Sequence, residues 1–204
     1  MFIRLQWQDR PVEGIDDELG RFDWSRIQTY QGYAEMVPHA VRGLAAAPDT
    51  KEAVRLGEWI ERILLSVAGP CEGCTPVATV LVATLPEMTP AGRSVALDLL
   101  SLIGAAEITG PAHEQIGAVD VAEIRQAVAG GFRHYVAVLQ TESASETDLY
   151  SCIDLMDILA FDEPRLTAIA TAALKGIRTG GRDPGLAMAI ENTLDDLASP
   201  SRNS

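Results

Sequence analysis

The chain has 204 residues, of which 47% are hydrophobic, so it can bury one substantial core and is not expected to be disordered over most of its length. Acidic residues outnumber basic ones, with 29 Asp and Glu against 16 Lys and Arg, and the formal net charge is −13. This balance argues against nucleic acid as a partner, because phosphate binding needs a basic patch or stripe.

No uninterrupted hydrophobic run approaches the roughly 18–20 residues that cross a bilayer, so we expect no membrane-spanning segment. The first seven residues, Met1 to Trp7, lack the basic start, apolar stretch and small-residue cleavage site of a secretory signal. A cytoplasmic protein fits these features best.

The chain begins with a segment that has no clear periodicity. Residues 1–22 are polar and acidic, and we interpret them as an irregular N-terminal arm. Residues 23–204 are expected to form a single domain. At its start, Asp23 can cap a short helix that ends at Gly32, a residue suited to the left-handed position after a helix. The larger side chains of this helix would be Trp24, Ile27 and Tyr30.

Proline marks the start of most later helices. Proline is tolerated in the first helical turn, where its missing N–H is not needed. The segments that show this are Val37-Pro38, Thr75-Pro76, Thr89-Pro90, Asp162-Glu163-Pro164 and Asp183-Pro184. One further helix opens with the spacing of a capping box, Asp49-Thr50-Lys51-Glu52.

Apolar residues after these starts recur at the helical spacing of three and four residues. Period-two alternation is absent, so no sheet is expected and more than half of the residues should be helical. Consecutive helices are expected to form antiparallel hairpins of roughly 35–40 residues each. A hairpin of this kind cannot bury its apolar face alone, so the hairpins should stack into a short α-solenoid. An irregular helical bundle is the alternative. The expected helices pair as 38–47 with 50–68, 76–86 with 90–106, 120–140 with 145–161, and 164–178 with 184–198.

Several residues in the first third of the chain match a known pattern. They are Trp24, Ile27, Gly32, Ala34, Glu35, Val37, Pro38, Val41 and Leu44. They resemble the opening of a large group of bacterial HEAT-repeat proteins, whose first helices carry W-x-x-I/L and then G-x-A-E-x-V-P.

Residues Cys71 to Leu85 resemble the next loop and helix of that family, although the tyrosine and second Val-Pro usual there are missing. The likeness extends to about Ala106. It implies an all-α fold, a HEAT-like α-solenoid of about four antiparallel helix hairpins, with a protein-binding role. Some small proteins of this sort act as immunity or antitoxin partners, and the family carries no catalytic motif that could be transferred here.

A C-x-x-C motif stands at Cys71 to Cys74, a spacing that can form half of a zinc site or a redox disulfide. A second pair of ligands is missing, and an odd number of cysteines does not suggest a disulfide framework. We therefore expect a helix-connecting loop, with no metal and no cofactor. The remaining candidate ligands are scattered: Cys152, His39, His113 and His134. Gly130-Gly131 indicates a kink or a close helix contact rather than a phosphate loop, since no Walker or G-x-G-x-x-G sequence surrounds it.

The strongest charge feature is an acidic segment, 142–163, which contains no Lys or Arg. Its carboxylates are Glu142, Glu146, Asp148, Asp154, Asp157, Asp162 and Glu163. Like charges this close repel, and a basic partner or a bound cation would relieve the repulsion; a solvated helix face is the alternative. The residues predicted to bind a partner are Glu142, Glu146, Asp148, Asp154 and Asp157.

Two classes of function remain open, with ligand-binding or regulatory roles as a minor third alternative. The first is a protein-binding scaffold, most sharply an immunity-like inhibitor of a basic toxin, with no catalytic residues. The alternative is an enzyme, a helical-repeat nucleobase glycosylase, which would need a basic DNA-binding surface that the overall charge does not offer.

Overall fold

The structure, a computed structural model, describes residues 14–111, 114–160, 163–177 and 183–199. Ten α-helices lie within these residues, and helix accounts for 69% of them. The protein is therefore all-α, and the prediction that more than half of the residues are helical is confirmed. No helix in the described part is long and apolar enough to cross a membrane.

The elements follow one another along the chain with short connections. The helices are α1 (Ile15–Leu19), α2 (Val37–Ala45), α3 (Thr50–Leu64), α4 (Cys74–Thr84), α5 (Pro90–Ala105), α6 (Val121–Ala129), α7 (Phe132–Leu139), α8 (Glu146–Ala160), α9 (Pro164–Lys175) and α10 (Pro184–Ala198). Two 3₁₀ turns are η1 (Ala34–Met36) and η2 (Leu85–Glu87), and four short strands are β1 (Gln28–Thr29), β2 (Gly32–Tyr33), β3 (Leu65–Ser66) and β4 (Gly69–Pro70).

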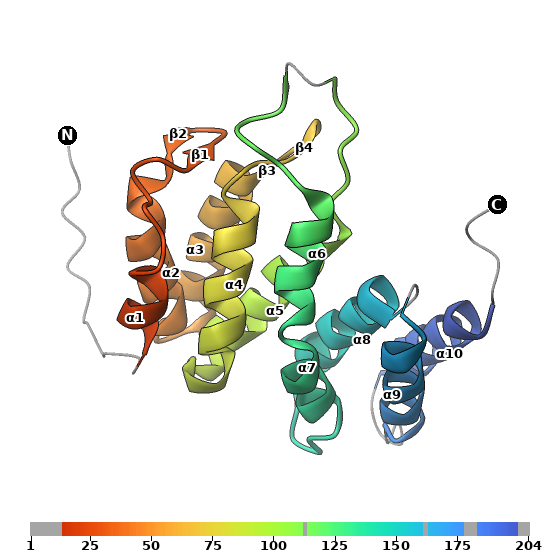
Figure 1. Cartoon of the computed structure of the whole chain (residues 1–204). Coiled ribbons are helices and arrows are strands. Elements are labelled where there is room, and N and C mark those ends of the chain that lie inside the picture. Colours follow the sequence, from red (N-terminus) through yellow and green to blue (C-terminus); the bar gives the residue numbers. More distant parts are fainter. Residues whose placement is uncertain (1–13, 112–113, 161–162, 178–182, 200–204) are drawn as a thin grey trace.

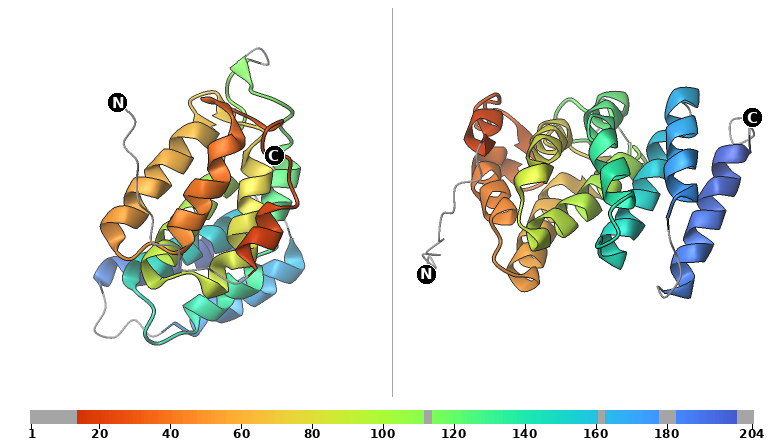
Figure 2. Two further views of the ribbon diagram at one scale, coloured as in Figure 1. Left: turned by 90° about the vertical axis from the view of Figure 1, so that its left-hand side faces the viewer. Right: turned by 90° about the horizontal axis from the view of Figure 1, so that it is seen from below.

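The helices lie in two layers, which are clearest in the right-hand view of Figure 2. One layer, in front in Figure 1, runs from α2 through α4, α6 and α7 to α9, and the other runs from α3 through α5 and α8 to α10. Consecutive helices also contact each other across the layers, as α2 does with α3 and α9 with α10. A single hydrophobic cluster of buried side chains extends from Ile15 to Ile190 and holds the two layers together.

Most start signals predicted from the sequence lie where helices begin, but at Thr75-Pro76 the helix α4 begins earlier, at Cys74, and has no side-chain cap. Pro38, Pro90, Pro164 and Pro184 all lie at the first or second position of their helices. The N–H of Glu52 donates to the Asp49 side chain at 2.9 Å, which opens α3. These signals act within one turn of the chain, so they do not depend on the rest of the fold.

The short helix expected from Asp23 is wrong, and so is the expectation that no sheet forms. Gln28 and Thr29 instead pair with Gly32 and Tyr33 in a two-residue antiparallel ladder. Gly32 has the expected positive φ of 106°, but it serves the turn of this hairpin. The physical reason is tertiary, because the backbone N–H of Tyr30 donates to the carbonyl that Ile63 presents near the end of α3, at 3.0 Å.

A second hairpin shortens the next predicted helix. The expected helix 50–68 ends at Leu64, and Leu65 and Ser66 pair with Pro70 and Gly69. Gly69 has a φ of 126°, and a Cβ there would lie 2.7 Å from the carbonyl oxygen of Glu107. The chain must therefore leave the helix to make this close backbone contact.

Part of the predicted irregular arm is helical. Residues 15–19 form α1, which contacts α4 and buries Ile15 and Leu19 against the core. The first thirteen residues lie outside the described part.

The predicted helix 120–140 is broken at Gly130 and Gly131 into α6 and α7. The predicted kink at this glycine pair is thus confirmed, and a Cβ on Gly131 would lie 2.3 Å from the hydroxyl of Tyr135, four residues further along the chain.

Candidate functional site

The acidic segment 142–163 folds mainly into α8, at the centre of the second layer between α5 and α10. Glu142, Glu146 and Asp154 are exposed, and Asp157 is half-buried. Asp162 lies outside the described residues, and Glu163 precedes the first turn of α9. Four of the five predicted partner-binding residues are therefore at least partly accessible.

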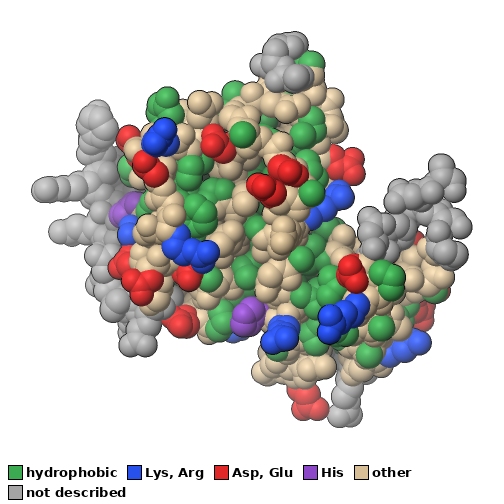
Figure 3. All heavy atoms as spheres, viewed as in Figure 1, with side chains coloured by type: hydrophobic (Ala, Val, Ile, Leu, Met, Phe, Trp, Pro, Cys, Tyr) green, Lys and Arg blue, Asp and Glu red, His purple; other side chains and the backbone are tan. Residues whose placement is uncertain are grey.

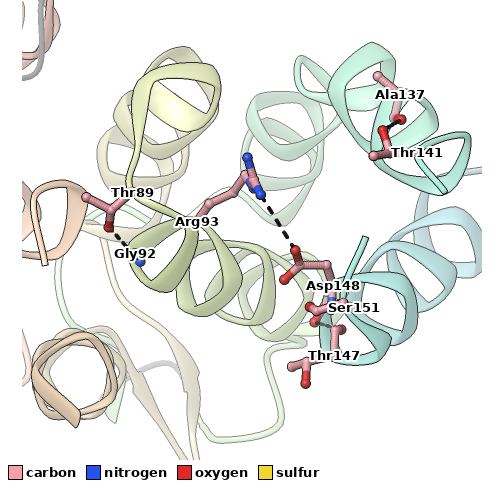
Figure 4. Close-up of polar contacts among 9 residues, drawn as sticks. Thr89, Gly92, Arg93, Ala137, Thr141, Thr147, Asp148 and Ser151 are labelled. Atoms are coloured by element: carbon pink, nitrogen blue, oxygen red, sulfur yellow. Dashed lines mark hydrogen bonds and ion pairs between the residues drawn. The ribbon is translucent and has the colours of Figure 1, made fainter. Parts of the chain in front are cut away.

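The fifth, Asp148, is not a surface residue, which corrects the prediction. Only 4% of Asp148 is exposed, because it faces α5. Its Oδ2 lies 3.9 Å from Nη2 of Arg93, a residue of α5, and the two side chains point toward each other in Figure 4. Its Oδ1 has no hydrogen-bond partner within the described residues. Asp148 thus contributes to the α5–α8 contact and cannot meet a partner directly.

The carboxylates at the start of α8 also have a local role. The N–H of Asp148 donates to Ser145 Oγ at 3.1 Å, so Ser145 caps this helix. Acidic side chains in a first turn are favoured by the helix dipole, which accounts for Glu146 and Asp148 without any partner. The Oε1 atom of Glu146 also accepts a hydrogen bond of 3.0 Å from the N–H of Asp183, at the start of α10.

Further along α8, Asp154 lies close to other carboxylates. The pKa of Asp154 is raised from its ordinary value by partial burial, by the neighbouring carboxylate of Asp157 and by that of Asp98 on α5. Three negative groups therefore come together where α5 and α8 meet. We call Asp98, Asp154 and Asp157 the α8 acidic face; Asp98 was missed in the sequence, because only the helix packing brings it there.

The two layers differ in charge at the C-terminal end of the molecule. Neither α8 nor α10 contains Lys or Arg, and α10 adds Glu191, Asp195 and Asp196. By contrast, α7 and α9 contain no Asp or Glu, and their exposed charged or titratable residues are Arg133, His134, Arg165 and Lys175. Figure 3 shows blue side chains over this end of the front layer. The segregation was missed because the sequence does not show which helices share a layer.

The cysteine motif lies on other elements than the acidic residues, in the connection from β4 to the first turn of α4. Cys71 and Cys74 are both fully buried, with their sulfurs toward the end of α3. Among the described residues no group of three or more His, Cys, Asp or Glu side chains has an arrangement that could hold a metal ion. His113 lies outside the described residues, and His134 is exposed on α7.

Comparisons with known proteins give no match: no protein-family model, curated protein sequence or solved structure is significantly similar to this chain. The arguments about function below therefore rest on the geometry and charge of the chain itself.

Proposed function

We propose that this protein is a protein-binding scaffold in which the two helix layers are the successive hairpins of a short HEAT-like α-solenoid. The support is the pattern of contacts. The two helices of a pair contact each other, as in α2–α3, α4–α5, α7–α8 and α9–α10, and helices of one layer contact those of the next pair, as in α3–α5, α5–α8 and α8–α10. Stacked hairpins of this kind present long, continuous surfaces suited to binding other proteins. This role needs no catalytic residue, metal or cofactor.

The single observation that carries the proposal is the α8 acidic face. The helix α8 contains no Lys or Arg, and the pKa of Asp154 is raised first by partial burial and then by the carboxylates of Asp157 and Asp98. A basic protein docking there would replace repulsion with attraction and would be steered toward the site at low salt. The most specific form of the proposal is an immunity-like inhibitor that covers a basic toxin.

A nucleobase glycosylase is the second candidate, and the cations of α7 and α9 are the observation that favours it. The helices α7 and α9 contact each other, and neither contains Asp or Glu. Their exposed cations are Arg133, Arg165 and Lys175. Proteins that bind DNA through 6–10 phosphate contacts use about as many cations. Three cations in a chain of charge −13 favour protein binding instead.

The test starts by capturing partners from the source cell at low salt with the intact protein and with two variants. Asp154→Asn with Asp157→Asn neutralises two positions of the α8 acidic face. Glu58→Gln with Glu61→Gln makes the same change in charge on exposed positions of α3, in the same layer, and serves as the matched control. A partner that uses the α8 acidic face is retained by the control and depleted with the Asp154 and Asp157 variant.

Binding kinetics with the recovered partner then decide the matter. We expect association to slow by roughly 3- to 10-fold in the Asp154 and Asp157 variant at low salt, and the difference to shrink as salt rises. Equal association rates for both variants would reject the α8 acidic face as the docking surface. Binding of a DNA duplex at low salt, lost on replacing Arg133 and Arg165 by Ser, would favour the glycosylase instead.

A further inference from the structure

The C-x-x-C motif forms a tight turn that brings its two thiols together. The N–H of Cys74 donates to the carbonyl of Cys71 at 3.1 Å. A turn closed in this way holds its end Cα atoms within about 7 Å, and disulfides join Cα atoms about 4.4–6.8 Å apart. Both sulfurs lie at the same place in the fold, because they approach the carbonyl oxygens of two consecutive residues, Ile63 and Leu64. Little movement separates this dithiol from a disulfide.

The surroundings hold both sulfurs in place. Sγ of Cys71 lies 3.6 Å from the carbonyl oxygen of Ile63, and Sγ of Cys74 lies 3.5 Å from that of Leu64. A Cβ on Gly73 would lie 2.8 Å from a methyl of Leu64 and 3.3 Å from that of Thr29, so a larger residue would force these side chains to shift. The thiols thus meet the last carbonyls of α3, which have no partner within that helix.

The motif also connects three parts of the fold. Between the two cysteines, the Glu72 carboxylate accepts a hydrogen bond of 3.1 Å from the N–H of Gln28 in the first hairpin. The N–H of Glu72 donates to the carbonyl of Ile116 at 3.0 Å, in the connection between α5 and α6. The four residues are thus a junction between the end of α3, the first hairpin and a long surface connection.

We propose that Cys71 and Cys74 are a modification site that forms a reversible intramolecular disulfide by exchange with small-molecule disulfides such as that of glutathione. This inference does not depend on the proposed function. The third cysteine, Cys152, is buried in α8 with neither other cysteine near it in the sequence, and it serves as an internal control.

The two thiols have different roles in the exchange. Interaction with the neighbouring Cys74 thiol, helped by the backbone N–H groups of Gly73 and Tyr30, holds the pKa of the Cys71 thiol below its ordinary value despite burial. Interaction with Cys71, together with burial, raises the pKa of Cys74. Cys71 is therefore the attacking thiolate and Cys74 the resolving thiol.

The reaction balances as two successive exchanges. Cys71 loses its proton and attacks one sulfur of the small disulfide, whose S–S bond breaks and releases one thiolate, which takes up a proton. Cys74 then loses its proton and attacks the Cys71 sulfur of the mixed disulfide, and the second small thiol leaves. Two protein thiols are oxidised and one small disulfide is reduced to two thiols. Because both sulfurs are fully buried, the first step requires local opening at the junction.

The experiment uses the reduced, folded, full chain. It is incubated with glutathione disulfide, quenched with acid, unfolded and alkylated, and the intact mass gives the number of free thiols. We expect the number of free thiols to fall from three to one. Peptide mapping should locate the new disulfide between Cys71 and Cys74, and dithiothreitol should restore all three free thiols. In Cys152→Ser the number should fall from two to none.

Two variants and one control make the outcome decisive. Cys74→Ser should stop the reaction at a glutathione adduct on Cys71, because the resolving thiol is gone. If Cys74→Ser does not fold, the wild type and Cys152→Ser still test the proposal. Three free thiols in the folded protein, at a time when the urea-unfolded chain has oxidised, would overturn it. A disulfide that includes Cys152 would do the same.

Discussion

The hydroxyl of Tyr150 donates a hydrogen bond of 2.8 Å to Asp183, the residue that caps α10. The other carboxylate oxygen of Asp183 accepts from the N–H of Gly185 at 3.2 Å, within the same cap. Together with the bond from the Asp183 N–H to Glu146, this contact fastens the start of the last helix to the side of α8. These interactions lower the pKa of Asp183 and raise that of Tyr150.

Tyr150→Phe is expected to loosen α10 without unfolding the rest of the domain. The change removes one exposed hydrogen bond, so hydrogen exchange should rise a few-fold in the first turns of α10 and remain unchanged in α3. Hydrogen–deuterium exchange followed by mass spectrometry measures both regions in one sample. Equal protection of α10 in the two proteins would show that its docking does not depend on the Tyr150 hydroxyl, and that the Glu146 contact and the apolar contacts of Leu186 and Ile190 suffice.

The Arg93–Asp148 pair should respond asymmetrically to substitution. Asp148 is buried while Arg93 is about one third exposed, and their nearest atoms are 3.9 Å apart. Arg93→Ala leaves a buried carboxylate without its counter-charge, and after allowing for solvent near the guanidinium we expect a loss of about 1–3 kcal/mol in the free energy of unfolding. Asp148→Asn removes the buried charge and should change stability by less than about 1 kcal/mol.

The double variant provides the control for this prediction. If the cost of Arg93→Ala comes from the buried charge, then Arg93→Ala with Asp148→Asn should be more stable than Arg93→Ala alone. Urea unfolding of the four proteins gives the interaction energy directly. A double variant that is no more stable than Arg93→Ala would assign the loss to the packing of the arginine stem.

The behaviour of Asp148 shows where prediction from sequence reached its limit. Helix starts such as those at Pro90 and Pro184 were predictable, since a proline and a cap act within one turn. The direction in which Asp148 points depends on α5, which is distant in the sequence, so α8 alone could not reveal its burial. The two hairpins were missed for the same reason, because the first depends on the contact between Tyr30 and Ile63.

The candidate site was predictable only in part. The many carboxylates of the α8 sequence predicted a site that includes Asp154 and Asp157. Asp98 lies on α5 and joins them only through helix packing. The cations of α7 and α9 were visible in the sequence as two helices without Asp or Glu, but their common layer was not.

Gly92→Ala is expected to destabilise the protein strongly although alanine favours helices. A Cβ at position 92 would lie 2.1 Å from the carbonyl oxygen of Leu44, so α5 and the end of α2 must move apart. Overpacking of this kind costs about 1–3 kcal/mol. Gly104→Ala, on the same helix, is the matched control, because its nearest neighbour would be 3.4 Å away. Thermal or urea unfolding should therefore separate the two variants, and equal stability would contradict the close approach of Gly92 to Leu44.

Asp154→Asn is expected to stabilise the protein near neutral pH and to lose this advantage in acid. The folded-state pKa of Asp154 lies above its ordinary value of 3.8, first because of partial burial and then because of Asp157 and Asp98. Below the pKa of the unfolded state the carboxyl is protonated in both states, so it does not lower the free energy of unfolding there. Stability is lost as pH rises through the folded pKa, because the carboxylate then ionises beside two others.

Asparagine never ionises, so the variant avoids this loss at pH 7. Since Asp154 is about half exposed, solvent screening limits the gain to a few tenths of a kcal/mol, on the order of 0.3–0.5 kcal/mol. Urea unfolding at pH 7 and again near pH 4 measures the change, and the advantage should shrink at the lower pH. Added salt should reduce only the part due to Asp157 and Asp98, because burial is not screened. Glu87→Gln, an exposed carboxylate on η2, serves as the control with no expected gain. A variant that is less stable than the wild type at pH 7 would mean that Asp154 makes a favourable contact in the folded protein.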